Sequence, residues 1–191
     1  MEMTALRLYQ NSSQILKQTG DERWKAVPKS RSVSFAMTEM DCRHIQFCDQ
    51  KAKVEANQLQ ELFQLAAFWA TDRTPDDMAV AIANSDPVIS AWDGDRLIGF
   101  ARATSDGIYR AVIWDVVIHP DYQGAGLGRK LVQTVLSHPK LNRVERVYLM
   151  TTHQQKFYER IGFEENASTT MVLYNPLVAT PENLLVATTE P

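Results

Sequence analysis

Apolar residues after position 44 follow first a short extended pattern and then helical spacing. Residues 45–47 can form a first strand. Five apolar residues then recur at i, i+3 and i+4, which is the spacing of one helix face: Leu59, Leu62, Phe63, Ala66 and Ala67. A second helix is predicted to start at Thr74, because threonine caps helices well and Pro75 suits the first turn. It should end before Pro87. The pattern therefore predicts a strand followed by two helices.

Strand patterns dominate the next part of the chain. Residues 88–92 and 97–103 are predicted strands, joined across the turn sequence Asp93-Gly94-Asp95. Residues 111–118 form a nearly continuous apolar run, which is typical of a strand buried on both faces. The remaining predicted elements are a helix over 127–136, a strand over 144–150, a short helix over 154–161, and closing strands at Phe163 and 171–174. This order predicts an α/β (α+β) domain built on a mixed sheet.

Length and composition are those of an ordinary globular protein. Of the 191 residues, 45% are hydrophobic and 23% are charged, which excludes collagen-like, wholly disordered and coiled-coil classes. At roughly 150 residues per domain, the chain holds one domain and some flanking sequence. We expect a partly ordered N-terminal extension over 1–43, with room for a short helix at 5–16. The domain should cover 44–175, and a loose tail should cover 176–191.

Charge and hydropathy narrow the partners and the compartment. The net charge is -3 and there is no long basic run, so a nucleic-acid partner is not expected. No apolar run approaches the roughly 18 to 20 residues that span a bilayer, so no membrane partner is expected either. The first thirty residues mix acidic and basic side chains without an apolar stretch, unlike a secretory or transit peptide. A cytoplasmic location is the expectation.

The two cysteines raise the question of a metal. Cys42 and Cys48, with His44 between them, offer three ligands. Their spacing matches no common zinc pattern and no fourth ligand stands nearby, so two plain thiols are favoured. No metal is expected.

Three of the eight glycines lie between positions 124 and 128, where the apolar strand gives way to a helix. Such a turn lets backbone N–H groups approach an anion at the positive end of the helix, and Arg129 and Lys130 add charge for a phosphate. A tight turn that merely needs glycine is the alternative. A dinucleotide fingerprint would need glycine where Arg129 stands. A nucleotide P-loop would need Gly-Lys-Ser/Thr, whereas Gly128 is followed by Arg129, Lys130 and Leu131. Both patterns are absent.

Two blocks of sequence identify a family resemblance. Residues 114–130 read WDVVIHPDYQGAGLGRK and residues 156–163 read KFYERIGF. With these blocks the chain resembles the GNAT-type N-acetyltransferases from about residue 45 to 174. Within that superfamily, ARATSD at 101–106 and IWDV at 113–116 resemble the plant and cyanobacterial branch of serotonin (arylalkylamine) N-acetyltransferases. The resemblance implies a GNAT-like single domain with a mixed, mostly antiparallel central sheet flanked by helices.

The resemblance also implies acetyl-CoA as the donor co-substrate. Val116, Val117 and Ile118 match the strand end whose backbone pairs with the pantetheine arm. The segment that matches the pyrophosphate loop comprises Gln123, Gly124, Ala125, Gly126, Leu127, Gly128 and Arg129. Thr152 has a hydroxyl that could hold an amide of CoA. One backbone N–H at the strand end would face the thioester carbonyl, where a fixed donor stabilises the oxyanion of the reaction.

Tyr158 matches the usual general acid of the family. A departing CoA thiolate benefits from a proton, and a phenol stays protonated at neutral pH. The alternative is a core aromatic beside Phe157. Phe157 and Ile161 share an i, i+4 face, so they are the natural core residues and Tyr158 is freer to point into a cleft. Tyr158 is therefore predicted to contact the donor and to act as the acid.

The general base has two candidates. Asp115 is an unusual carboxylate on an apolar strand, and alternation predicts it on the face opposite Trp114 and Val116. It could equally be a structural hydrogen-bond acceptor. His153, at the start of the last helix, has a suitable ordinary pKa but could only cap that helix. Members of the plant branch tend to carry an acid seven residues before the tyrosine, and this chain has Thr151 there.

The acceptor is expected to be a primary amine. Phe68 and Trp69 lie in a segment that often lines the acceptor cleft of this family, and with Asp115 they are the predicted substrate-binding residues. An arylalkylamine such as serotonin or tryptamine is favoured because a flat ring gains from burial and stacking. The alternatives are a protein lysine, which Asp72 and neighbouring acids would suit, and a CoA-binding regulatory module without catalysis. A homodimer is left open.

Overall fold

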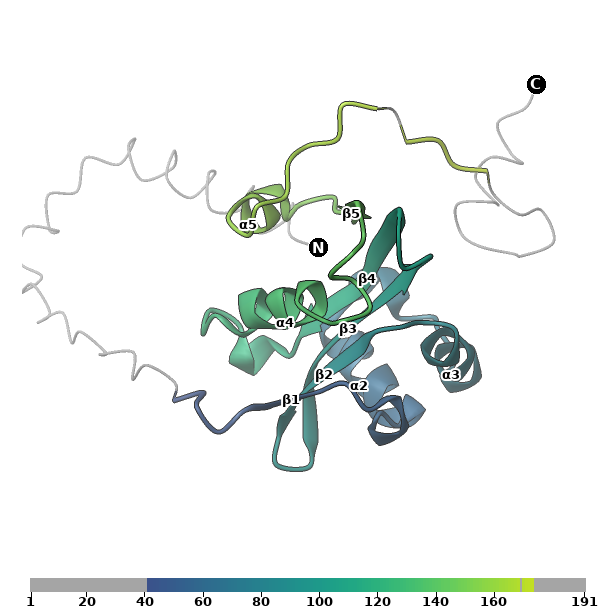
Figure 1. Cartoon of the computed structure of the whole chain (residues 1–191). Helices are drawn as coiled ribbons and strands as arrows, with labels where there is room; N and C mark the ends of the chain where they lie inside the picture. The colour runs from purple at the N-terminus through teal and green to yellow at the C-terminus, as the bar shows by residue number, and fades with distance from the viewer. Residues whose placement is uncertain (1–40, 169, 174–191) are drawn as a thin grey trace, which may run out of the picture. The chain divides into compact units, whose positions relative to one another are not determined.

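The computed structural model describes residues 41–168 and 170–173 (Figure 1). The predictions for the N-terminal helix at 5–16 and the tail at 176–191 lie outside the described residues. The longer elements, in chain order, are β1 (Gln46–Cys48), α2 (Ala56–Ala66), α3 (Pro75–Ala83), β2 (Val88–Asp93), β3 (Arg96–Ser105), β4 (Arg110–Ile118), α4 (Leu127–Leu136), β5 (Arg146–Tyr148) and α5 (Gln155–Glu159). Short 3-10 turns stand between them: η1 (Lys51–Lys53), η2 (Phe68–Ala70) and η3 (Pro120–Tyr122).

Five strands form one sheet in the order β1-β2-β3-β4-β5. The first four strands pair antiparallel, and β5 pairs parallel to β4. Helices α2 and α3 cover one face of the sheet, where Phe63 and Met78 pack against Phe100 and Val117. Helix α4 covers the other face, and α5 packs beside it at its partly buried side chains. The prediction of a mixed, mostly antiparallel sheet flanked by helices is confirmed.

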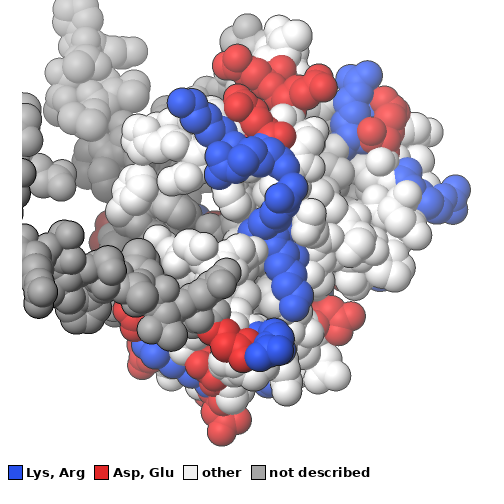
Figure 2. Space-filling model, turned by 90° about the vertical axis from the view of Figure 1, so that its left-hand side faces the viewer, with Lys and Arg blue, Asp and Glu red and all other residues white. Residues whose placement is uncertain are grey.

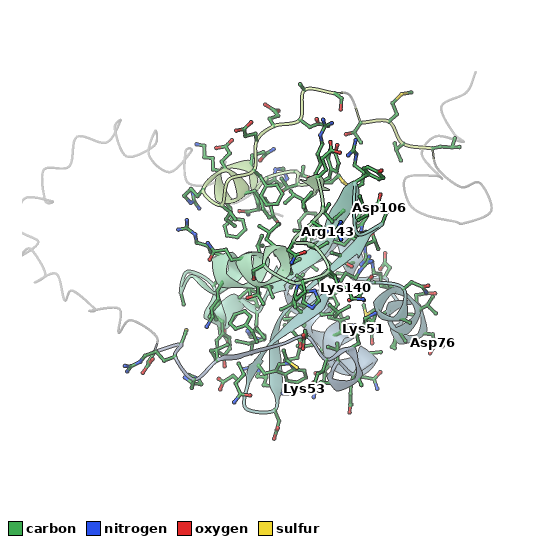
Figure 3. All side chains as sticks on the ribbon, in the orientation of Figure 1. Lys51, Lys53, Asp76, Asp106, Lys140 and Arg143 are labelled. Atoms are coloured by element: carbon green, nitrogen blue, oxygen red, sulfur yellow. The ribbon has the colours of Figure 1, made fainter. Side chains whose placement is uncertain are left out.

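Local sequence signals set several element ends. The Thr74 hydroxyl accepts a hydrogen bond from the Asp77 N–H at 3.2 Å, and α3 begins at Pro75 as predicted. The turn between β3 and β4 is closed by Asp106, which stands at the end of the hairpin in Figure 3. Its Oδ1 accepts from three consecutive backbone N–H groups, those of residues 108 to 110, and these bonds lower the pKa of Asp106.

Strand β4 carries a bulge that the alternating pattern did not reveal. Val117 pairs with Phe100 and Trp114 pairs with Arg102, so two residues of β4 face the single Ala101. One of them, Asp115, has a positive φ of 54°. Alternation predicted Asp115 on the face opposite Trp114 and Val116. This is confirmed for Val116, which packs on the side of α4, whereas Asp115 lies on the side of α2 and α3. It was wrong for Trp114: Trp114 and Asp115 both contact Arg102, because the extra residue breaks the two-residue period.

Strands β4 and β5 are paired over only a short stretch, because β5 is much shorter than β4. Their register consists of three pairs, Arg110 with Arg146, Ala111 with Val147 and Val112 with Tyr148. β4 continues to Ile118, so residues 113–118 present a backbone edge that β5 does not cover. β5 ends at Tyr148, so the C-terminal half of β4 has a free edge.

The C-terminal part departs from the predicted pattern. β5 spans only Arg146–Tyr148, shorter than the strand predicted over 144–150. Phe163 and residues 171–173 are not in strands, and Tyr174 lies outside the described residues. Met171 and Leu173 are almost fully exposed, so no partner in the described part of the chain holds them in an extended pair. Within residues 41–168 and 170–173, none of the helices has the length and apolar character needed to span a bilayer.

Candidate active site

The glycine-rich loop ends at the N-terminus of α4. Gly124 and Gly126 have φ values of 82° and 78°, which side-chain-bearing residues rarely adopt. A Cβ atom at either position would meet no atom within 4 Å, so the backbone there is open. Gly126 is the N-cap residue and supplies no side chain to the first N–H groups of the helix. The loop can therefore offer these groups to an anion such as a pyrophosphate.

The flanks of this loop are fixed. Gln123 donates from Nε2 to the carbonyl of Ile118 at 3.0 Å, which ties the loop to the end of β4. Leu127 is buried with Ile98 of β3 and anchors the start of α4. Of the predicted loop residues, Gln123 and Leu127 thus use their side chains for structural contacts. Ala125 lies between the two positive-φ glycines and is exposed.

The first turn of α4 contacts α5. A Cβ on Gly128 would lie 3.5 Å from Cζ of Phe157, so the two helices approach closely at this point. Arg129 donates from its guanidinium to the carbonyl of Arg160 at 2.9 Å. Basic side chains also come from Lys130 and Lys156. Figure 2 shows a band of Lys and Arg side chains across the face of the molecule on which α5 and the N-terminal end of α4 lie in Figure 1.

The free edge of β4 holds the predicted arm-binding residues. Val117 is buried under α2 and α3, whereas Val116 and Ile118 pack on the side of α4. Their backbone lies beyond Val112, where pairing with β5 stops. A bound chain with amide groups could pair with this edge as an added strand.

Tyr158 lies in an aromatic cluster on α5, which packs against the same core as Val116 and Ile118. Its ring centroid is 4.9 Å from that of Phe157 and 5.8 Å from that of Phe163, both edge to face. The side chain is partly buried, and burial raises the pKa of Tyr158. The phenol is therefore held in its protonated form well above neutral pH.

The residues before α5 serve its N-terminus. The Thr151 hydroxyl accepts a hydrogen bond from the Gln154 N–H at 3.1 Å, and the carbonyl of Thr152 accepts from the Gln155 amide at 3.1 Å. His153 is exposed. The threonine at the position where the plant branch tends to carry an acid thus organises the turn that leads into α5.

Asp115 belongs to a cluster with two arginines. Its Oδ2 accepts from Arg102 Nε at 2.7 Å and lies 2.9 Å from a guanidinium nitrogen of Arg73. The Asp115 side chain is only 6% exposed, against 15% for Arg102 and 38% for Arg73. Arg102 also donates to the buried hydroxyl of Ser85 at 3.0 Å. The cluster therefore fixes the bulge of β4 to the link between α2 and α3.

A cavity of about 200 Å³ lies beside this cluster. Apolar side chains of α2, α3 and β3 line it together with four charged ones: Leu59, Phe63, Met78, Ala81, Ile82 and Phe100, with Arg73, Asp77, Arg102 and Asp115. Neither arginine was predicted from the sequence to belong to the site. Arg102 could have been found as the cross-strand neighbour of Trp114, but Arg73 follows no pattern that marks it.

Phe68 and Trp69 stand on η2, between α2 and α3. Their rings make an edge-to-face pair with centroids 5.0 Å apart, and the residues are 74% and 51% exposed. They do not line the cavity, but the same link continues to Arg73, which reaches Asp115. The structure thus places the predicted aromatic residues on the segment that borders the charged cluster.

The three residues considered as metal ligands, Cys42, His44 and Cys48, are not joined in one site in the structure. Cys42 and Cys48 are both free thiols, and His44 pairs with Asp93 at 3.2 Å. Within residues 41–168 and 170–173, no three His, Cys, Asp or Glu side chains gather as a metal site would need.

Comparisons with known proteins agree with this geometry. The model of the acetyltransferase (GNAT) family matches residues 56–163. The chain is 35% identical over 129 residues to "Uncharacterized N-acetyltransferase ycf52" of Pyropia yezoensis, covering 64% of this chain and 74% of that protein. It is 43% identical over 70 residues to "Histone acetyltransferase TAP1" of Glycine max, covering 36% of this chain and 30% of that protein.

A solved structure shows the same fold. It is an acetyltransferase described as belonging to the GNAT family, from Xanthomonas campestris pv. campestris. The TM-score is 0.63 at 26% identity, covering 70% of this chain and 94% of that one. The glycine loop before α4, the free edge of β4 and the family match that covers both lead to one conclusion. This chain belongs to the GNAT family of acetyltransferases.

Proposed function

We propose that this acetyltransferase transfers the acetyl group of acetyl-CoA to a small arylalkylamine such as serotonin or tryptamine. The observation that carries the acceptor class is the exposed pair of Phe68 and Trp69 on the link that leads to Arg73 and Asp115. Two adjacent, largely exposed aromatic side chains are costly in water unless a ligand covers them. A flat ring stacked there would bury apolar area on both partners.

The donor is proposed to lie along the glycine loop and the free edge of β4. The pyrophosphate would be held by backbone N–H groups of the loop at Gly124 and Gly126 and by the start of α4. The pantetheine arm would pair with the free edge of β4 at Val116 and Ile118. A backbone N–H at that edge would donate to the thioester oxygen, which becomes an oxyanion during attack.

The reaction follows from these positions. The lone pair of the amine nitrogen attacks the thioester carbon, and the tetrahedral intermediate collapses with cleavage of the C–S bond. Tyr158 gives its phenolic proton to the departing sulfur, for which its raised pKa keeps the proton available. The nitrogen, which is cationic after the attack, loses one proton to the solvent and leaves a neutral amide. The phenol regains a proton from the solvent after CoA leaves.

The amine is proposed to enter as the free base. Asp115 was one candidate to remove the proton of the amine. Its Oδ2 already accepts a hydrogen bond from Arg102 and pairs with Arg73, which favours a positioning role. His153, the other candidate, is exposed before α5. Deprotonation by solvent before binding requires neither residue.

The test measures release of free CoA with tryptamine and with a lysine peptide at equal concentrations. We expect tryptamine to have the higher kcat/KM. Trp69→Ala should raise KM for tryptamine more than for the peptide, because only the flat ring stacks on it. Tyr109→Ala removes another exposed aromatic side chain, far along the chain on the β3–β4 turn, and should change neither value. Equal effects of Trp69→Ala on both acceptors would refute the arylalkylamine assignment.

A protein lysine is the second candidate acceptor. It is supported by the 43% identity to a relative named "Histone acetyltransferase TAP1" and by acidic residues near the aromatic pair, Asp72, Asp76 and Asp77. These carboxylates could attract a basic peptide. A peptide that is acetylated faster than tryptamine would move the proposal to this acceptor.

A further inference from the structure

Helix α5, which carries Tyr158, is short, and it packs on the core only through partly buried side chains. It spans only Gln155–Glu159, and none of its five residues is fully buried. An isolated helix of this length is not stable in water, so contacts with the rest of the protein must hold it. The orientation of the Tyr158 phenol depends on those contacts.

Two contacts join α5 to the first turn of α4. Phe157 lies against Gly128, where a Cβ would be 3.5 Å from the ring. Arg129 donates to the carbonyl of Arg160 at 2.9 Å, across 31 positions of sequence. Carbonyls at the end of a helix lack partners within the helix, and a cationic donor suits them. Arg129 therefore caps the end of α5 from outside.

Arg129 links the proposed donor site to the helix that carries Tyr158. It is the third residue of α4 and comes directly after the glycine loop, so its backbone belongs to the donor site. Its side chain contacts the carbonyl of Arg160, which is two residues after Tyr158 in the sequence. We propose that Arg129 is a positioning residue, which fixes α5 on α4 so that the phenol of Tyr158 faces the thioester sulfur. This inference rests on the proposed role of Tyr158 as general acid.

The competing role for Arg129 is a direct contact with phosphate. An arginine that binds phosphate affects only acetyl donors that carry phosphate, and it changes their binding and hence KM. A positioning residue acts on the chemical step whatever the donor carries, and it acts only through Tyr158. The two roles therefore predict different kinetics for the same variant.

The first experiment compares two donors, acetyl-CoA and S-acetylpantetheine, which lacks all phosphate groups. Arg129→Met keeps most of the side-chain length and removes the donor. We expect kcat/KM to fall about 10- to 100-fold with both donors, since misplacement by about 1 Å can cost 10²-fold. Arg129→Lys should recover most of the loss, because an ammonium group can also donate to the Arg160 carbonyl. A loss confined to KM for acetyl-CoA would overturn the inference.

A matched control comes from Arg110, another exposed arginine that donates to a backbone carbonyl, that of Tyr109 at 2.8 Å. Arg110→Met should leave the rate with both donors unchanged. A similar loss in this variant would show a general effect of surface arginines and overturn the inference. Thermal unfolding of each variant checks that the fold is retained.

The second experiment is a double-variant cycle with Tyr158→Phe. If Arg129 acts through the phenol, Arg129→Met should cost less than about 2-fold in kcat once the hydroxyl is gone. A full, multiplicative loss in the Tyr158→Phe background would overturn the positioning role while leaving the acid in place. Wild-type kcat in the single Tyr158→Phe variant would instead overturn the proposed acid, and this inference with it.

Discussion

Asp115→Asn separates a structural role of the carboxylate from a role in proton transfer. Asparagine tolerates a positive φ about as well as aspartate does, so the bulge at φ 54° should persist. The charge is lost, and Arg102 and Arg73 are left without their shared partner. Removing one member of a buried ion pair costs about 3–5 kcal/mol. Arg73 is 38% exposed and can turn toward water, whereas Arg102 cannot, so we expect a loss near the lower limit, about 3 kcal/mol.

The assay is urea unfolding followed by tryptophan fluorescence, with the slope of the unfolding free energy against urea compared between variants. Asp115→Ala should lose about 1–2 kcal/mol more than Asp115→Gly, because alanine resists the left-handed conformation that glycine adopts freely. The interpretation fails if Asp115→Asn is within about 0.5 kcal/mol of wild type, the range of an ordinary surface change, and yet has lost its turnover. That result would assign Asp115 to proton transfer.

Three further predictions concern the loop, the acid and a helix start. Gly126→Glu should abolish acetyl-CoA binding in calorimetry, while Gly126→Ala, which has the same strain at φ 78° but no charge, should retain binding. The value of kcat/KM should rise with pH as the amine loses its proton. Because burial raises the pKa of Tyr158, kcat/KM should not fall before about pH 10, and a fall between pH 7 and 9 would contradict this. Thr74→Ala removes the cap on Asp77 N–H and should lower the free energy of unfolding by about 1 kcal/mol, measured by urea unfolding, with activity retained.

Features that depend on neighbouring residues in the chain were predictable from the sequence. Thr74 and Pro75 mark the start of α3 because capping and the fixed φ of proline act within one turn. The glycines at 124 and 126 mark the loop because a positive φ is a local requirement. The hairpin between β2 and β3 follows from Gly94 in the same way.

Features that depend on distant partners were not predictable. The bulge at Asp115 arises opposite Ala101 of β3, so alternation along β4 alone did not show that Asp115 and Trp114 share a face. Arg73 and Arg102 reach Asp115 from other elements, and a single sequence does not show such contacts. The contact of Arg129 with the end of α5 joins positions 31 apart.

The proposed chemistry depends most directly on Tyr158, and one kinetic comparison tests it. The measurement is amine-dependent release of CoA from acetyl-CoA and tryptamine by wild type, Tyr158→Phe and the control Tyr109→Phe, at saturating substrates. We predict turnover by wild type and the control, and a kcat about 10²- to 10⁴-fold lower for Tyr158→Phe, the usual contribution of a general acid. A Tyr158→Phe variant that turns over tryptamine at the wild-type rate would contradict the account.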